Sequence, residues 1–296
     1  MSRQVSIRHL TRYRFDRPVD IMPHMVRLRP APHCRTPVTR YRLNIEPTSH
    51  FLHWQQDPFA NHVARLVFSE PCDGLDIDVE LTAQLTPFNP FDFFLEPSAT
   101  VFPFTYPDEL LRGLAPFLET DEADTELLAW VEAGRSTDCG TIDFLVEENR
   151  RTQQAIKYLQ RFESGVQSCR DTLQSRSGSC RDSSWLLIQT LRHLGLAARF
   201  VSGYLIEVND GATPRSPASD DGSAEGFTGL HAWVEVFVPG AGWIGLDPTS
   251  GLLASEGHIP LACAPDAGNT APVTGATSPC QVTMEYRNEI IDIRPG

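Results

Sequence analysis

The chain has 296 residues, a formal charge of −13 and a pI of about 5.1, with 41% hydrophobic and 21% charged residues. A chain of this length usually divides into two lobes, each of which buries its own core. The acidic balance excludes a general affinity for nucleic acid or anionic membranes, because both need clustered Lys and Arg. We therefore expect no nucleic-acid and no membrane partner, and the sequence leaves the oligomeric state open.

The seven cysteines are scattered, odd in number and without a Cys-x-x-Cys pair. This spacing disfavours a disulfide framework and a zinc ribbon. The start of the chain lacks the apolar run of a secretion signal, and no window approaches about 18 unbroken apolar residues. We expect a cytoplasmic chain with mostly inert thiols and no bound metal.

The N-terminal third shows the alternation of apolar and polar residues that is typical of β-strands. The clearest segments are 5–15, 40–46, 62–68 and 75–81. Several short strands without intervening helices predict a β-sandwich-like lobe, which we place at residues 1–105.

Residues 86–107 contain five prolines among several phenylalanines. Because proline removes a backbone donor from a β-ladder, we expect a connector that packs through its aromatic side chains. Helical patterns follow at 125–132 and 147–162. The second pattern has an apolar stripe formed by Ala155, Tyr158, Leu159 and Phe162.

A further helix is predicted to begin at Cys180. Gly178 interrupts the chain, Ser179 is a favourable N-cap, and Asp182 completes a capping box three residues later. Gly195 stands where helices commonly end, so the helix should span about 15 residues. The Cys180 thiol then lies among unpaired N–H groups at the positive end of the helix dipole, which favour a thiolate and an oxyanion. Asp182 opposes this effect electrostatically, so a partner base is needed.

A strand at 198–208 precedes a predicted hairpin that supplies such a base. Its strands are expected at 230–238 and 243–249, joined by a turn near residue 240. The return strand brings Asp247 back toward His231, allowing for a bulge. A carboxylate beside a histidine fixes its tautomer and stabilises the imidazolium, which in turn favours a nearby thiolate.

The stretch 209–229 is polar and rich in Gly, Ser, Pro and Asp. A stretch of that length without regular structure is either a linker or a functional loop. Because it directly precedes His231, we predict that it forms a lid at the mouth of the site. We assign residues 106–296 to a second domain with its core at about 165–250 and expect a last strand at Gln281–Tyr286.

Each of the three residues also has an ordinary explanation when taken alone. A free cysteine is often a small buried hydrophobe, and His231 could be a structural or surface histidine. An aspartate before Pro248 could simply start a turn. Their combination at the start of one helix and on one hairpin favours a nucleophile, a base and an orienting carboxylate.

Four motifs in this order make the chain resemble the bacterial transglutaminase-like superfamily. They are Gly178-Ser-Cys-Arg-Asp182, Ala198-Arg-Phe-Val-Ser-Gly-Tyr204, His231-Ala-Trp-Val-Glu235 and Trp243-Ile-Gly-Leu-Asp-Pro-Thr249. The first 100 or so residues are similar to the N-terminal β region of bacterial members, with Arg27-Leu-Arg-Pro30 as a further match.

The resemblance implies an α+β fold with a papain-like core, in which a helix bearing the cysteine packs on an antiparallel sheet. By motif position, Cys180, His231 and Asp247 are the catalytic residues. The implied chemistry is attack on a peptide or protein amide, with a thioester that passes to an amine or to water. Fold alone does not choose among cross-linking, deamidation, amidase and peptidase activities.

Two aromatic residues on the predicted strands, Trp233 and Tyr204, are candidates for substrate binding or oxyanion stabilisation. No cofactor is implied, and no EF-hand-like loop occurs that would predict a calcium requirement. The alternative is a non-catalytic peptide-binding or protein-binding module on the same fold.

Overall fold

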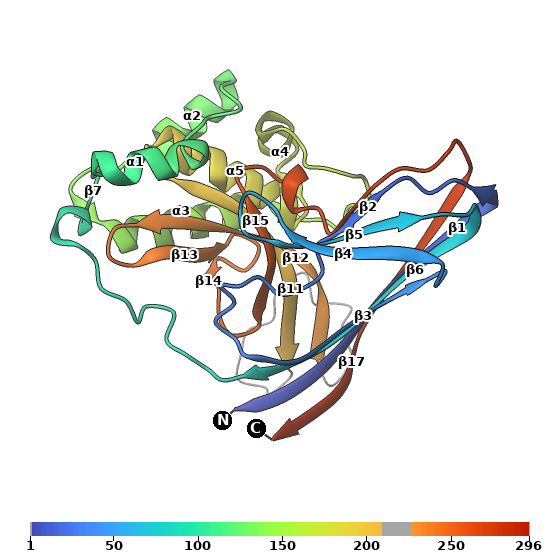
Figure 1. The fold of residues 1–296 in the computed structure, drawn as a ribbon. Helices are drawn as coiled ribbons and strands as arrows, with labels where there is room; N and C mark the ends of the chain where they lie inside the picture. The colour runs from blue at the N-terminus through green and yellow to red at the C-terminus, as the bar shows by residue number, and fades with distance from the viewer. Residues whose placement is uncertain (1, 209–225, 296) are drawn as a thin grey trace.

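The computed structural model describes residues 2–208 and 226–295. The helices gather at one end of the molecule, and the long strands of the N-terminal lobe extend away from them toward the other end (Figure 1). The chain termini lie side by side, because the first and last strands pair with each other. The expected α+β class is confirmed.

Two four-stranded antiparallel sheets form the N-terminal lobe. The first has the order β17-β1-β6-β3 and consists of β1 (Arg3–Val19), β3 (Val38–Glu46), β6 (Cys72–Leu85) and β17 (Val282–Pro295). The second has the order β16-β2-β5-β4 and consists of β2 (His24–Val26), β4 (His50–Gln56), β5 (His62–Phe68) and β16 (Val273–Thr274).

The inward residues of both sheets share one core, to which Ile7, Ile77 and Leu66 contribute. This is the predicted sandwich, because strands that alternate apolar and polar residues bury one face each. All four strand segments read from the sequence are present, and β2, β4 and β16 add to them.

The last strand is hydrogen-bonded into a sheet of the first lobe. β17 pairs with β1 from Arg3↔Pro295 to Phe15↔Val282. The strand expected at Gln281–Tyr286 therefore exists, but it is longer and closes the N-terminal sandwich. A domain boundary at residue 105 assigns this strand to the second domain by its position in the sequence. Its hydrogen bonds to β1 assign it to the first lobe.

The connector and the helical region lead from the sandwich to the site. Their elements are η1 (Pro97–Ala99), β7 (Val101–Phe102), α1 (Asp108–Leu114), η2 (Ala115–Phe117), α2 (Thr125–Gly134), β8 (Cys139–Gly140) and α3 (Thr141–Ala155). The connector packs through some of its aromatic residues: Phe102 stacks on Phe144 with ring centroids 3.8 Å apart, whereas Phe94 is exposed. The helix predicted at 125–132 is confirmed by α2.

The helix predicted at 147–162 is wrong beyond Ala155, where α3 ends. Lys157–Tyr158 forms β9 instead, which pairs in parallel with β10 (Ser177–Gly178). Phe162 is exposed and does not continue a buried stripe. Pairing with a distant segment outweighs the local helical periodicity here, because propensity is a weak prior that tertiary contacts override.

The central sheet and the helix that packs on it form the second lobe. The sheet is antiparallel and has the order β14-β13-β12-β11-β15, with β11 (Ala198–Val208), β12 (Gly226–Val238), β13 (Gly242–Asp247), β14 (Leu252–Leu253) and β15 (His258–Ala264). Two helices, α4 (Cys169–Ser175) and α5 (Cys180–His193), precede it, and η4 (Gly268–Thr270) follows it.

The leucines of α5 share a core with Phe200 on β11 and Val234 on β12, so the cysteine-bearing helix packs on an antiparallel sheet as expected. β12 already begins at Gly226, so residues 226–229 of the predicted loop are strand; the remainder, 209–225, lies outside the described residues. Among the helices that the structure describes, none has the length and apolar character needed to cross a bilayer.

Candidate active site

Helix α5 begins at Cys180, as the capping pattern predicts. The carboxylate of Asp182 accepts hydrogen bonds from the Ser179 backbone N–H (2.7 Å) and the Ser179 hydroxyl (2.8 Å). At the other end, Gly195 has a φ of +83°, which a residue with a Cβ adopts only under strain. The helix therefore starts and stops where local sequence dictates, and the Cys180 side chain is half-buried in its first turn.

Asp182 does more than cap the helix. Its side chain is fully buried, and it also accepts from Arg161 Nη1 (2.6 Å) and from the Gln167 backbone N–H (2.7 Å). Burial alone would raise the pKa of Asp182, but these hydrogen bonds outweigh it and hold the pKa below its ordinary value. The positive charge of Arg161 thus offsets the negative charge that would otherwise oppose a thiolate at the helix start.

The β9–β10 pair fixes the approach to Cys180. Gly178 lies opposite Tyr158, and the Leu159 N–H donates to the Gly178 carbonyl at 2.8 Å. The backbone at Gly178, two residues before Cys180, is therefore held by β9, a strand that lies before α4 in the chain. This contact explains why residues 156–162 leave the helical pattern.

The hairpin of β12 and β13 brings His231 and Asp247 together. Its register runs from Val238↔Gly242 to Val234↔Leu246 without a bulge. Continued by one residue, this register places Asp247 opposite Trp233, and therefore diagonal to His231 on the same face. The observed distance from His231 Nε2 to Asp247 Oδ2 is 3.2 Å, and both side chains are 1% exposed.

Four donors surround the carboxylate of Asp247. Its Oδ1 accepts from the Thr249 N–H at 2.8 Å, and its Oδ2 accepts from the Ser250 hydroxyl at 3.0 Å. Oδ2 also faces Nε2 of both His231 (3.2 Å) and His258 (3.4 Å). Burial would raise the pKa of Asp247, but the two histidines lower it well below its ordinary value. Asp247 is therefore an ionised acceptor, so His231 Nε2 carries a proton and donates it.

The other ring nitrogen of His231 points away from Asp247. Nδ1 is buried and has no hydrogen-bond partner among the described residues. The imidazole is nevertheless coupled to Cys180: burial disfavours its charged form, but Asp247 and Cys180 together raise the pKa of His231 to about 10. Because Nε2 is committed to Asp247, Nδ1 is the nitrogen left to exchange a proton with the Cys180 sulfur.

Trp233 lies beside these residues but is buried. Its ring is 6.4 Å from that of His231 and 5.1 Å from that of His258, and it is 1% exposed. Gly203 makes room for it, since a Cβ there would come within 2.4 Å of the Trp233 ring. Trp233 therefore covers the histidines from the protein side, and this position supports exclusion of water more than direct contact with a substrate.

Tyr204, the other aromatic candidate, is not brought to this cluster. Its ring packs against His9 with centroids 5.7 Å apart, and it belongs to the core of the N-terminal lobe. Its side chain is fully buried, and the hydroxyl has no hydrogen-bond partner among the described residues. Its surroundings are those of a residue that joins the two lobes.

A metal could in principle be held by His231, Asp247 and His258, whose donor atoms lie within 4.8 Å of one another. Imidazole and carboxylate ligands suit Zn²⁺ and related ions. However, the Ser255 N–H donates to His258 Nδ1 at 3.1 Å, so in the neutral ring the proton sits on Nε2. A nitrogen that carries a proton cannot bind a metal. The arrangement fits a hydrogen-bonded carboxylate better than a metal centre.

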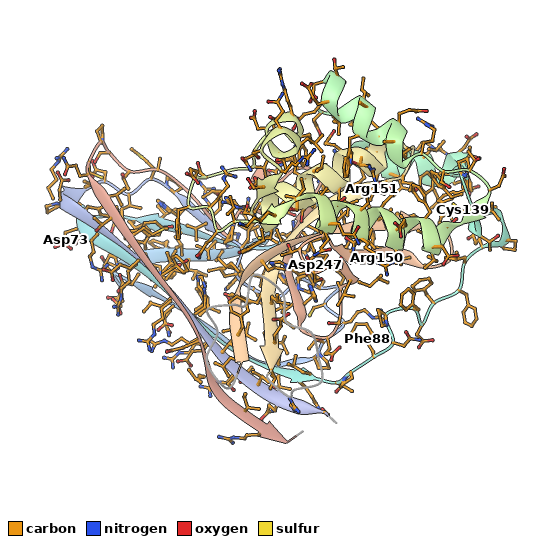
Figure 2. All side chains as sticks on the ribbon, turned by 180° about the vertical axis from the view of Figure 1, so that it is seen from behind. Asp73, Phe88, Cys139, Arg150, Arg151 and Asp247 are labelled. Carbon is orange, nitrogen blue, oxygen red and sulfur yellow. The ribbon has the colours of Figure 1, made fainter. Side chains whose placement is uncertain are left out.

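His258 is the residue of this cluster that sequence reasoning missed. It stands on β15, outside the hairpin, and no motif or spacing connects it with His231. In the sheet order, β15 is separated from β13 by β12 and β11. Only the folded sheet brings the His258 ring to Asp247. Asp247 lies near the middle of the molecule, and Asp73 lies at the distal tip of the N-terminal lobe (Figure 2).

Three of the other thiols, those of Cys34, Cys169 and Cys263, are less suited to nucleophilic chemistry. All seven cysteines are free. Burial raises the pKa of Cys34 and of Cys263 to about 11 each, and it raises the pKa of Cys169 further. None of these three has an imidazole that interacts with it as His231 does with Cys180. Cys180 is thus distinguished by its neighbours.

Two protein-family models match parts of this chain. Residues 5–84 match the bacterial transglutaminase-like N-terminal region, and residues 141–248 match the transglutaminase-like superfamily. The chain belongs to the transglutaminase-like superfamily.

Uncharacterized proteins of Mycobacterium tuberculosis and Mycobacterium bovis are each 26% identical to this chain over 295 residues, covering 97% of this chain and 90% of theirs. The crystal structure of a candidate cysteine protease from Cytophaga hutchinsonii superimposes with a TM-score of 0.69 at 17% identity, over 99% of this chain and 92% of that one. At this identity the similarity supports the shared fold.

Proposed function

We propose that this protein is a cysteine-dependent acyl-transfer enzyme in which Cys180 is the nucleophile, His231 the acid and base, and Asp247 the orienting carboxylate. The observation that carries the proposal is the environment of His231. Its Nε2 is bound by a buried, ionised carboxylate, its Nδ1 has no other described partner, and its charged form is favoured by Cys180. These are the requirements of a thiolate–imidazolium pair.

In the first half-reaction, the Cys180 sulfur attacks the carbonyl carbon of a peptide or protein amide. The developing oxyanion lies near the start of α5, where the Cys180 N–H has no partner within the helix. The carbon–nitrogen bond breaks as His231 Nδ1–H gives its proton to the leaving nitrogen. The products are an amine or ammonia and a thioester on Cys180.

In the second half-reaction, neutral His231 Nδ1 takes a proton from an incoming amine or water. That nucleophile attacks the thioester carbon, and the carbon–sulfur bond breaks to restore the thiolate and the imidazolium. Transfer to an amine gives a cross-link, and transfer to water gives a carboxylate. Water exclusion decides between the two outcomes, and the buried Trp233 beside His231 favours exclusion on the protein side.

The proposal is tested first by the reactivity of Cys180. Limited alkylation of the folded chain with iodoacetamide at neutral pH, mapped by mass spectrometry, should modify Cys180 far faster than Cys34 or Cys263. These two serve as internal controls because burial raises their pKa values. Equal rates at the three positions would contradict an activated thiolate.

Turnover is tested on a peptide-amide panel with and without a primary amine. Wild type should release ammonia or amine, Cys180→Ala should not, and Cys34→Ala is the matched control that retains activity. Incorporation of the amine identifies transfer, and its absence identifies hydrolysis. If the chain is instead a non-catalytic binding module, wild type and Cys180→Ala should bind peptides equally well. Neither should then form a thioester.

We also propose a cellular location for the protein, based on the redox state of its thiols. The seven free cysteines and a nucleophile that oxidation would inactivate suit a reducing compartment such as the cytoplasm. Fractionation of cells with an antibody against the chain tests this assignment, and recovery outside the cytoplasm would contradict it.

A further inference from the structure

The second histidine on Asp247 has no role in the scheme above. His258 Nε2 lies 3.4 Å from the same Oδ2 oxygen that His231 Nε2 approaches at 3.2 Å. The His258 side chain is 8% exposed, and its ring centroid is 6.0 Å from that of His231. Two imidazoles therefore converge on one buried carboxylate oxygen from different strands of the sheet.

The direction of the His258–Asp247 hydrogen bond is set by the backbone. The Ser255 N–H donates to His258 Nδ1 at 3.1 Å, which requires a lone pair on Nδ1. In the neutral ring the proton must then sit on Nε2, facing Asp247. The backbone N–H of Ser255 thus fixes the tautomer in which His258 Nε2 is the donor.

The Trp233 ring secures the same geometry from a second side. It contacts the His258 ring edge-to-face at an interplanar angle of 85° and a centroid distance of 5.1 Å. Gly203 on β11 leaves the space that Trp233 fills. The His258 ring is therefore fixed by packing and by a hydrogen bond at each of its two nitrogens.

We propose that His258 is a positioning residue for the acyl-transfer reaction: its Nε2–H holds the Asp247 carboxylate in the orientation that keeps His231 Nδ1 directed at Cys180. This inference rests on the proposed function. His258 acts through Asp247 and touches neither the nucleophile nor the substrate. Sharing Oδ2 between two donors also disperses the carboxylate charge, so the proton between His231 and Asp247 stays on nitrogen.

The tautomer is tested on the wild-type protein without any substitution in the site. With ¹⁵N-labelled histidine followed over a pH series, the neutral form of the His258 ring should show a protonated Nε2 and an unprotonated Nδ1. Assignment uses the signal that disappears in His258→Gln. A protonated Nδ1 with an unprotonated Nε2 would overturn the proposal.

The positioning role is tested with two variants that differ in one property. His258→Phe keeps the ring and removes the donor, whereas His258→Gln can place an amide N–H near the former Nε2. We expect iodoacetamide alkylation of Cys180 at neutral pH to slow about tenfold in His258→Phe and to remain within about threefold of wild type in His258→Gln. The His258→Phe rate should also depend more steeply on pH, because the imidazolium partner is less well held.

Equal slowing in both variants at unchanged Tm would assign His258 to packing and overturn the positioning role. The same two substitutions in an Asp247→Asn background complete a double-mutant cycle. His258→Phe should have no further effect there, and an undiminished effect would show that it does not act through Asp247. A wild-type Cys180 that reacts no faster than Cys34 would instead contradict the proposed function itself, so the two failures are distinguishable.

Discussion

Two surface ion pairs of the N-terminal sandwich contrast with the buried pair at the candidate active site of the second lobe. In the N-terminal sandwich, Arg8 pairs with Asp78 and Arg14 with Asp76 on an outer face, and the arginine side chains are 40% and 52% exposed. In the second lobe, His231 and Asp247 pair at 1% exposure. Exposed pairs contribute little to stability, whereas buried charges are costly unless each is fully hydrogen-bonded.

Two buried carboxylates of the second lobe are fully hydrogen-bonded. Asp247 accepts hydrogen bonds on both oxygens, and the buried Asp182 accepts from Ser179, Gln167 and Arg161. Asp247 contacts His231, and Asp182 lies in the first turn of α5 with Cys180. Each of these buried carboxylates is thus fully supplied with hydrogen-bond donors beside the candidate active site.

The largest effect is expected from Asp247→Asn. The amide can present an N–H to His231 Nε2 and so favour the wrong tautomer, which should slow acylation of Cys180 by about 10³–10⁴-fold. Single-turnover thioester formation measures the rate. Asp76→Asn in the N-terminal lobe is the matched control, and its rate should equal that of wild type. A loss of less than about tenfold in Asp247→Asn would show that orientation by this carboxylate is unimportant.

A pH dependence of stability is expected from His231. Its pKa is raised to about 10 in the folded chain from an ordinary value of 6.5, so the folded state retains a proton that the unfolded state loses. The resulting stabilisation is complete below pH 6.5 and declines as pH rises toward 10. Urea unfolding across this range should give a steeper loss for wild type than for His231→Asn. Parallel pH profiles would contradict the coupling.

A smaller effect is expected from Asp182→Ala. It removes four hydrogen bonds, one of them from Arg161, which loses its buried partner, so the free energy of unfolding should fall by about 2–3 kcal/mol. The comparison is Asp124→Ala, since Asp124 only caps α2 by accepting from the Leu127 N–H at 2.9 Å. That variant should lose about 1 kcal/mol. Equal losses in denaturant melts would mean that the Arg161 contact adds nothing.

The smallest effect is expected on the outer face of the sandwich. Arg8→Ala removes both hydrogen bonds to Asp78, yet it should lower the free energy of unfolding by less than about 1 kcal/mol, because water screens the pair. Raised salt should shrink even that difference. A loss comparable to that of Asp182→Ala would remove the contrast between the lobes.

Much of the site was predictable because its determinants are local. The start of α5 at Cys180 depends on Ser179 and Asp182, which lie within four residues of each other. The approach of Asp247 to His231 depends on a short turn and on the two-residue periodicity of strands. The N-terminal strands likewise follow from alternation, since each buries one face.

Other features depended on partners far along the chain. The stripe that includes Leu159 and Phe162 has helical periodicity, but residues 157–158 pair with 177–178 instead. Tyr204 and Trp233 are both aromatic residues on predicted strands of the second lobe. Tyr204 nevertheless packs against His9 of the N-terminal lobe. Alternation predicts that a residue faces one side of a sheet, and it does not say what covers that side.

The sequence by itself determined where the helix that bears Cys180 begins and which hairpin brings His231 to Asp247, because caps and turns act between near neighbours in the chain. Only the tertiary structure decided that His258 reaches Asp247, that Arg161 neutralises Asp182 and that the last strand closes the first sheet on β1. Those contacts join segments separated by 11, 21 and about 280 residues. Their formation depends on how whole sheets stack and twist, which no local pattern encodes.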